Sequence, residues 1–266
     1  MLTIISGQGA LPEQIVEGCK TRPIVASLEQ FPPDSLQSDI IFRLETLGSF
    51  FQQLKMLGVN QVCFAGSIRR PKVKMELVDK MTLGLVPSLL QSMDQGDDSV
   101  LRTVIAAFEQ NGFTIVGAQE VLPELLPRAG IISKLVPTDA DVRNIKRATD
   151  VLRALEQLDV GQGCIVSNNQ VLAIEAFGGT DWMLKSLNSR TEDWPYGGVL
   201  VKALKAGQDC RIDLPTVGPD TVIRAAVAGL SGIAIQAGGV ILLNPKSVRE
   251  LADLHGIFVS IFEHTL

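Results

Sequence analysis

The fold is decided by MLTIISGQGALP, residues 1–12, in which an apolar segment runs into a glycine turn and then a proline. The apolar, β-branched first half predicts a buried strand. Gly7 and Gly9 permit backbone conformations that other residues avoid, and Pro12 is typical of a first helical turn. Strand, turn and helix in this order begin an α/β unit.

The same alternation continues along the first half of the chain. Strands are predicted at 23–28, 61–65 and 113–116, an extended or loop segment at 39–44, and helices at 47–57 and 98–110. In the first of these helices, apolar residues recur at three- and four-residue steps, and Gly58 stands where a C-cap belongs. The alternation predicts a Rossmann-like domain, residues 1–130, in which helices cover a parallel sheet. Ligands of such sheets bind beyond the carboxyl ends of the strands.

The pattern changes after residue 130. We predict a linker at 131–138 and a second, catalytic α/β domain with a mixed sheet at 139–266. Its predicted helices are 139–158, 220–229 and 245–255, and its predicted strands are 163–166, 171–175, 198–202, 232–236 and 239–243. The turn Ser167-Asn168-Asn169 lies between two apolar runs and predicts a hairpin.

Charge and hydropathy exclude some classes of function. The 266 residues carry a formal net charge of −5, which argues against a DNA or RNA binder because such proteins need a basic surface. The mean hydropathy is +0.24, yet no apolar run reaches the roughly 18 residues that cross a bilayer. We therefore expect a soluble protein, on which an apolar patch is more typical of an oligomer interface than of a lipid site.

Cysteine and histidine usage narrows the chemistry. The four cysteines form no C-x-x-C pair and predict reduced, mostly buried thiols of a cytoplasmic protein. Both histidines, His255 and His264, lie near the C-terminus, which argues against a Ser-His-Asp triad or a H-E-x-x-H zinc site in the first half. Acid–base or metal chemistry there falls to carboxylates, which prefer Mg²⁺ or Mn²⁺.

The glycine turn of the first domain is a candidate ligand site. Gly7, Gly9, Ala10 and Leu11 place backbone N–H groups where they can face a phosphate or sugar. The alternative is that the glycines serve only the geometry of the turn. A dinucleotide site is less favoured, because the third glycine of the G-x-G-x-x-G fingerprint is missing.

A second candidate is the pair Arg69-Arg70, which follows the predicted strand 61–65 and precedes Pro71. Two arginines at this edge of the sheet can clamp a phosphate bidentately. The alternative is an ordinary solvated arginine pair.

The second domain has a candidate loop in EAFGGTD, residues 175–181. Glu175 ends a predicted strand, and glycines separate it from Thr180 and Asp181, which suits close approach of the loop to a ligand. The alternative is that Thr180 or Asp181 is the N-cap of a helix that begins at Trp182.

A third candidate loop follows the predicted strand 198–202. Lys202 and Lys205 end that strand, and Asp213 stands in a stiff segment with Thr216 and Gly218. A neighbouring lysine and arginine favour the ionised form of this aspartate. Asp213 is therefore a candidate metal ligand or catalytic base, with a structural turn residue as the alternative.

In their order along the chain, six motifs resemble a known family. They are GQGALP, AGSIRRP, GAQEVLPELL, EAFGGTD, GVLVKALKAGQDCRIDLPTVGPDTV and GIAIQAGGVILLN. The whole chain resembles the UDP-2,3-diacylglucosamine pyrophosphatase family of lipid A biosynthesis, of the magnesium-dependent two-domain type. Gly178 and Gln236 stand where members of this family usually carry glutamate.

The resemblance implies hydrolysis of UDP-2,3-diacylglucosamine to UMP and 2,3-diacylglucosamine 1-phosphate, with the substrate in a cleft between the two domains. It implies that Asp213 is catalytic and that Asp213, Asp181 and Glu175 hold Mg²⁺ or Mn²⁺. Together with the loops above, it predicts as substrate-binding residues Gly7, Gly9, Ala10, Leu11, Arg69, Arg70, Thr180, Lys202, Lys205, Thr216 and Gly218.

Two other functions stay open on the sequence, a non-catalytic binder of an acylated nucleotide sugar and a Rossmann-type NAD(P) oxidoreductase. The expected partner is the small-molecule UDP-sugar substrate, with no nucleic acid. We expect a cytoplasmic protein in peripheral contact with the inner face of the inner membrane, since an isoelectric point of about 5.2 disfavours stronger binding to anionic lipid. A homodimer is the expected assembly.

Overall fold

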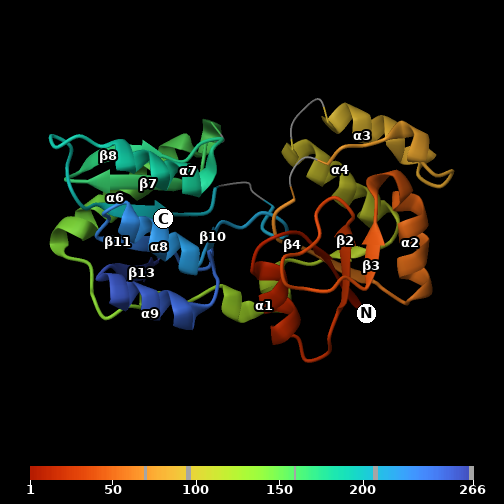
Figure 1. Cartoon of the computed structure of the whole chain (residues 1–266), viewed down its shortest axis with the longest axis horizontal. Coiled ribbons are helices and arrows are strands. Elements are labelled where there is room, and N and C mark those ends of the chain that lie inside the picture. The colour runs from red at the N-terminus through yellow and green to blue at the C-terminus, as the bar shows by residue number, and fades with distance from the viewer. Residues whose placement is uncertain (69–70, 94–96, 159, 206–208, 264–266) are drawn as a thin grey trace. The chain divides into compact units, whose positions relative to one another are not determined.

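The computed structural model describes residues 1–68, 71–93, 97–158, 160–205 and 209–263. The chain divides into two compact units, Met1–Pro123 and Glu124–Leu266. In Figure 1 the ribbon of the first unit runs from red to yellow and that of the second from yellow-green to blue. Each unit carries its own sheet, so each is described by itself.

The first unit contains a five-stranded parallel sheet in the order β3-β2-β1-β4-β5. The strands are β1 (Leu2–Ser6), β2 (Ile24–Leu28), β3 (Ile40–Phe42), β4 (Gln61–Ala65) and β5 (Thr114–Ile115). This is the strand order of a Rossmann-type sheet. Successive strands are added on one side of β1 up to β3, and then on its other side from β4 onward. The structure confirms the Rossmann-like parallel sheet that the sequence predicts.

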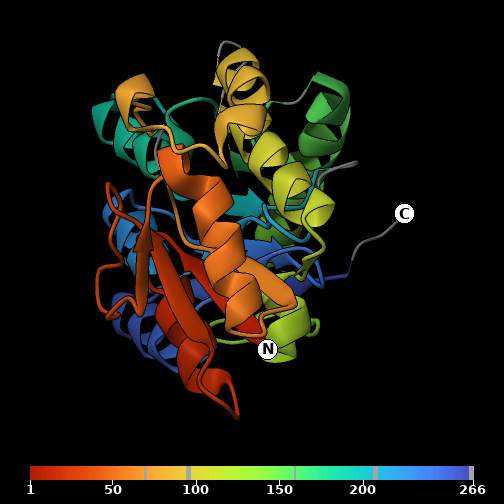
Figure 2. The same cartoon turned by 90° about the vertical axis from the view of Figure 1, so that its right-hand side faces the viewer.

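The helices of the first unit are α1 (Leu11–Gly18), α2 (Leu47–Met56), α3 (Val86–Met93), α4 (Asp97–Gln110) and α5 (Ala118–Val121). An aromatic cluster joins two of them to the sheet. Phe50 of α2 stacks on Phe42 of β3 with ring centroids 4.0 Å apart, and Figure 2 shows α2 in orange along the red strands. Phe108 of α4 contacts Phe51 of α2 and Phe64 of β4 edge to face, an arrangement that aromatic rings favour.

The second unit contains a six-stranded mixed sheet in the order β6-β13-β11-β9-β7-β8. Its strands are β6 (Gly130–Ile131), β7 (Gly163–Ser167), β8 (Gln170–Ile174), β9 (Val199–Lys202), β11 (Gly232–Gln236) and β13 (Phe258–Phe262), and a separate parallel pair is formed by β10 (Thr216–Val217) and β12 (Ile241–Leu242). The central strands β9, β11 and β13 are parallel, whereas β6 and β7 run antiparallel to their neighbours. The mixed sheet is as predicted.

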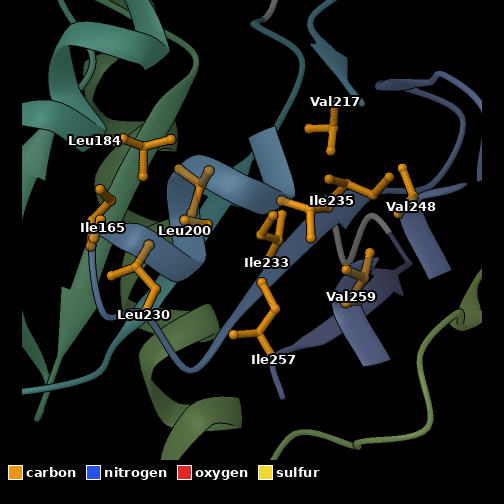
Figure 3. Close-up of a cluster of buried hydrophobic side chains, with 14 of the residues drawn as sticks. Ile165, Leu184, Leu200, Val217, Leu230, Ile233, Ile235, Val248, Ile257 and Val259 are labelled. Carbon is orange, nitrogen blue, oxygen red and sulfur yellow. The ribbon is translucent and has the colours of Figure 1, made fainter. Parts of the chain in front are cut away.

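Four helices pack in the second unit, namely α6 (Asp139–Leu155), α7 (Gly179–Ser186), α8 (Pro219–Val227) and α9 (Pro245–His255). Figure 3 shows side chains of one buried cluster, in which Leu200 of β9 and Ile233 of β11 lie between Leu184 of α7 and Val248 of α9. Burial of each such side chain contributes roughly 1.5–3 kcal/mol. The cluster fixes the central strands, whose ends carry the candidate residues described below.

Short 3₁₀ turns complete both units: η1 (Leu44–Thr46), η2 (Met75–Leu77), η3 (Leu83–Leu85), η4 (Pro123–Leu125), η5 (Glu156–Leu158) and η6 (Leu187–Ser189). Helix α3, strands β6, β10 and β13 and most of these turns go beyond what the sequence predicts. The predicted hairpin is confirmed, because Asn168 and Asn169 both have positive φ, 50° and 64°, between β7 and β8. Asparagine tolerates this conformation better than other residues with a Cβ atom.

The cysteines bear out only part of the prediction made for them. None of the four, all of them among the described residues, is in a disulfide, but Cys63 and Cys164 are buried, Cys19 is half-buried and Cys210 is exposed. Burial raises the pKa of the Cys63 and Cys164 thiols to about 12, so these two stay protonated. The expectation of mostly buried thiols therefore holds for two of the four.

In the part of the chain that the structure describes, every helix is too short or too polar to span a bilayer.

We expect a pH-dependent loss of stability at Asp39, beside β2. Burial tends to raise the pKa of this carboxyl, but the Arg22 guanidinium and the Val25 N–H, both 2.8 Å away, bring the pKa below its usual range. A depressed pKa stabilises the fold above the unfolded-state pKa, and this contribution disappears as the pH falls through the folded-state value. The protection factor of the Val25 amide, which is the intrinsic exchange rate at each pH divided by the observed rate, should therefore fall below about pH 4, and Asp39→Asn should remove this dependence. An unchanged pH profile in the variant would contradict the assignment.

Candidate active site

A pocket of about 610 Å³ opens on the second unit. Its wall includes Gly161, Glu175, Phe177, Lys205 and Asp213. This volume falls within the usual range for a small-molecule site. Three of the residues that the sequence singles out therefore meet in one pocket, although 38 residues separate Glu175 from Asp213.

The strands place these residues at one edge of the sheet. Both β8 and β9 run antiparallel to β7, so their carboxyl ends lie on the same side. Glu175 directly follows β8, and its backbone N–H donates to the Gly163 carbonyl oxygen over 2.8 Å. Lys205 comes three residues after β9. The carboxyl edge of the sheet is where α/β proteins bind ligands.

Gln236, the last residue of β11, holds the segment that carries Lys205. Its Oε1 accepts a hydrogen bond from the Leu204 N–H over 3.0 Å, and the Gln236 side chain is buried. Position 236 has to supply a side-chain oxygen that accepts this hydrogen bond. Glutamine can do so as well as the glutamate that the family usually carries there. The structure thus gives Gln236 a role in positioning the loop after β9.

Glu175, Thr180 and Lys202 form a closed network at the back of the pocket wall. The Thr180 hydroxyl donates to Glu175 Oε1 over 2.7 Å and accepts from Lys202 Nζ over 2.6 Å. Lys202 Nζ also lies 3.5 Å from Glu175 Oε2. Glu175 is in the pocket wall, whereas Lys202, the last residue of β9, is only 5% exposed. The structure brings these three predicted residues together.

Lys202 is a buried cation. Desolvation lowers the pKa of its ammonium group below the usual range, and the facing Glu175 carboxylate opposes that shift, with smaller contributions from Asp181 and Asp213. A buried charge needs a partner and hydrogen bonds. Glu175 and Thr180 supply them.

Asp213 differs in its environment from two aspartates near it in the sequence, Asp209 and Asp220. Asp209 forms a two-pronged ion pair with Arg211, with Nε–Oδ1 at 2.9 Å and Nη2–Oδ2 at 2.7 Å. Asp220 lies exposed in the first turn of α8. Asp213 is exposed and lines the pocket, and its N–H donates to the Asp209 carbonyl oxygen over 3.2 Å. Arg211, the arginine that the sequence places near Asp213, is thus paired with Asp209, and its expected influence on Asp213 stays a prediction.

Asp181 and Thr180 do not have the helix-capping role that the sequence offers as an alternative. Helix α7 begins at Gly179 with Gly178 as its N-cap, so both residues lie inside the first turn. The Thr180 hydroxyl bonds to Glu175, and Asp181 Oδ1 lies 3.2 Å from Arg224 Nε on α8. The capping alternative is wrong because the helix starts three residues earlier than Trp182, at Gly179, which has a φ of +73°.

The carboxylates of the second unit bear on whether it can hold Mg²⁺. Among the residues that the structure describes, no three His, Cys, Asp or Glu side chains gather into a metal-binding group. However, Glu175 and Asp213 line one pocket, and Mg²⁺ in proteins is often held by one or two carboxylates together with substrate phosphates. These two residues fit an ion shared with a diphosphate. Asp181 is paired with Arg224 instead, and the set of three ligands stays a prediction.

The glycine turn of the first unit has a geometric reason. A Cβ atom on Gly7 would lie 2.5 Å from the Ser67 carbonyl oxygen, because Gln8 and Ser67 pair as a bridge. The Gly9 N–H donates to the Asp34 carboxylate over 2.7 Å, so an internal anion already binds one of the predicted donors. Ala10 is the N-cap residue and Leu11 the first residue of α1. Ligand contact at this turn stays a prediction.

The remaining predicted residues lie as follows. Thr216 begins β10, and its hydroxyl donates to the Leu214 carbonyl oxygen over 3.3 Å. Gly218 is the N-cap residue of α8. Arg69 and Arg70 lie outside the described residues. A smaller pocket of about 310 Å³ lies along the connection between β2 and β3 in the first unit.

Sequence reasoning missed two glycines that shape the pocket. Gly161 has a φ of +52°, and a Cβ atom there would lie 1.8 Å from the Glu175 carbonyl oxygen; a Cβ atom on Gly163 would lie 2.6 Å from Glu175 Oε2. The signal was present as G-Q-G directly before a predicted strand. A Cβ atom on Gly178 would likewise meet the Trp182 ring at 2.8 Å, so the glycine found there instead of glutamate suits this packing.

Comparison with known proteins decides the family. Residues 1–125 match the family model of the LpxI N-terminal domain, and residues 128–260 match that of the LpxI C-terminal domain. The chain belongs to the LpxI family. It is also 38% identical to the UDP-2,3-diacylglucosamine pyrophosphatase LpxI of Caulobacter vibrioides over 274 residues, which covers 97% of this chain and 96% of the relative. The two LpxI domain matches meet near residue 126, close to the division between the two compact units.

Proposed function

We propose that this chain hydrolyses the pyrophosphate bond of UDP-2,3-diacylglucosamine, releasing UMP and 2,3-diacylglucosamine 1-phosphate for lipid A biosynthesis. The observation that carries the proposal is the full-length similarity to a relative named for this pyrophosphatase activity. The pocket of the second unit is consistent with it, because a cation and two carboxylates line one hollow. With this activity the chain is a hydrolase that acts on a phosphorus anhydride.

The residues of the pocket have distinct roles in this proposal. Asp213 is exposed to solvent in the pocket, so it can orient a water molecule and accept its proton as the water attacks phosphorus. The Lys205 side chain supplies positive charge to the diphosphate in the same pocket. Pyrophosphate cleavage requires positioning and charge stabilisation more than covalent catalysis, which carboxylates and lysines can provide without histidine.

We propose further that the reaction depends on Mg²⁺, with Mn²⁺ as a substitute. Glu175 and Asp213 would hold the ion together with the diphosphate of the substrate. The bound ion neutralises charge on the phosphate oxygens.

The substrate carries two acyl chains, so we place the protein in the cytoplasm, in peripheral contact with the inner face of the inner membrane. We separately propose that the protein is a homodimer. Flotation with vesicles of bacterial phospholipid tests the membrane contact, and light scattering after gel filtration tests the dimer. Protein that stays at the bottom of the gradient would overturn the membrane contact, and a monomer mass would overturn the dimer.

The decisive experiment is an assay with the purified chain, UDP-2,3-diacylglucosamine and Mg²⁺. We expect equimolar release of UMP and 2,3-diacylglucosamine 1-phosphate, measured by chromatography, and loss of this release on chelation with EDTA. Tight binding of the substrate without UMP at any divalent ion tested would overturn the enzymatic proposal and point to a carrier of acylated nucleotide sugars. UMP release that persists in EDTA would overturn the magnesium requirement alone.

A further inference from the structure

Lys202 has a position that the proposed reaction does not by itself explain. It ends β9, its side chain is 6% exposed, and its ammonium group faces Thr180 at 2.6 Å and Glu175 at 3.5 Å. The residues that line the pocket include Glu175 but not Lys202, in the part of the chain that the structure describes. The cation therefore sits behind the carboxylate.

The Glu175 carboxylate is held from several sides. Oε1 accepts from the Thr180 hydroxyl, Oε2 faces the Lys202 ammonium group, and Oε2 also packs against Gly163, where a Cβ atom would approach to 2.6 Å. Within the described residues, Oε2 has no hydrogen bond of its own and depends on the ion pair. Without Lys202 this buried oxygen atom would lose its charged partner.

The charges of the pocket make the Lys202 ammonium group necessary if an anionic ligand is to bind there. Glu175 and Asp213 are two negative groups in the wall, and a diphosphate brings further negative charge. Like charges at short range in a partly buried site repel strongly. Lys202 offsets the charge of Glu175 and Lys205 offsets that of Asp213, so these four groups together carry no net charge toward the ligand.

We infer that Lys202 is a positioning residue of this pocket, which fixes the Glu175 carboxylate through Thr180 and balances its charge so that a diphosphate can bind beside it. This inference rests on the proposed function for the chemical class of the ligand. The juxtaposition of a buried lysine, a threonine and a glutamate at the carboxyl edge of the sheet carries it.

The test compares single and double variants at pH 8, where a glutamate carboxylate is ionised. Lys202→Met should weaken binding of inorganic pyrophosphate, measured by calorimetry in EDTA without divalent ions so that only the charges of the chain act, by about tenfold, because it leaves Glu175 uncompensated. Glu175→Gln alone should bind pyrophosphate at least as tightly as the unmutated chain. The double variant Lys202→Met with Glu175→Gln restores the charge balance, so its Kd should return to within about threefold of the original.

Kinetics give a second measure. For release of UMP, Lys202→Met should raise KM about tenfold and leave kcat within about threefold, because the change acts on ground-state binding of the anion. Lys185→Met is the matched control, since it removes one exposed lysine charge from the last turn of α7 and should leave both parameters unchanged.

Three results would overturn the inference. They are an unchanged pyrophosphate Kd in Lys202→Met, a double variant that binds as weakly as Lys202→Met, and a fall in kcat without a rise in KM. If Lys202→Met does not fold, the inference still requires the double variant to match the unmutated chain, and a double variant at least tenfold weaker would show direct contact of Lys202 with the ligand. Absence of UMP release from the unmutated chain would overturn the proposed function, while the pyrophosphate measurements would still decide the role of Lys202.

Discussion

Asp213→Asn is expected to lower kcat for UMP release by about a thousandfold, because the amide keeps the size of the side chain but cannot accept a proton from water. Asp213 is exposed and lines the pocket, so the melting temperature should stay within about 2 °C of the original. The measurement is steady-state release of UMP at saturating substrate, together with a thermal unfolding curve for each protein.

The control for this prediction is Asp220→Asn. It removes a carboxylate seven residues away, on the exposed first turn of α8, and it should retain most of the activity. If Asp213→Asn kept the kcat of the unmutated chain, as Asp220→Asn is expected to do, Asp213 would be a structural residue of its loop. If Asp220→Asn alone lost activity, the catalytic role would belong to α8.

Gly161→Ala is expected to lower the free energy of unfolding of the second unit by about 3 kcal/mol, from positive φ and from overpacking together. The residue has a φ of +52°, and the new methyl group would lie 1.8 Å from the Glu175 carbonyl oxygen, which cannot move without shifting the end of β8. Both tryptophans, Trp182 and Trp194, lie in the second unit. Their fluorescence during urea titration therefore reports on this unit alone.

Gly256→Ala is the matched control for that change. Gly256 also has a positive φ, 66°, but nothing lies within 4 Å of the position that its Cβ atom would occupy. It should cost only about 1–2 kcal/mol, the penalty of the left-handed conformation. Equal losses in the two variants would mean that the pocket wall adapts to the methyl group.

Local patterns in the sequence were enough for the strands of the first sheet and for β7, β8, β9 and β11 of the second. The glycine turn at residues 7–9 and the periodic apolar residues of 47–57 are signals within a few residues, and the elements they predict are present. The short strand β10 lacks such a signal because it exists only through its partner β12. Strand β13 was missed although Phe258–Phe262 is an apolar run of ordinary strand length.

The candidate site also has parts that local sequence predicts and parts that it does not. The loop that carries Asp213 was found from its own prolines and glycine, and the pocket includes it. The pairings of Arg211 with Asp209, of Asp181 with Arg224 and of Gly9 with Asp34 were not predicted. Each depends on which of several nearby or distant groups lies within hydrogen-bonding distance, and tertiary packing determines that.

The hydrogen bond from Gly9 to Asp34 has a consequence for any ligand of the first turn. The N–H group is already in a charge-assisted bond of 2.7 Å, which is about twice as strong as a bond to a neutral acceptor. A sugar hydroxyl is too weak an acceptor to replace it, and the Asp34 carboxylate repels a phosphate unless its side chain moves away. Asp34 therefore occupies the anion position of the turn, and Asp34→Ala would free the Gly9 N–H for a phosphate oxygen.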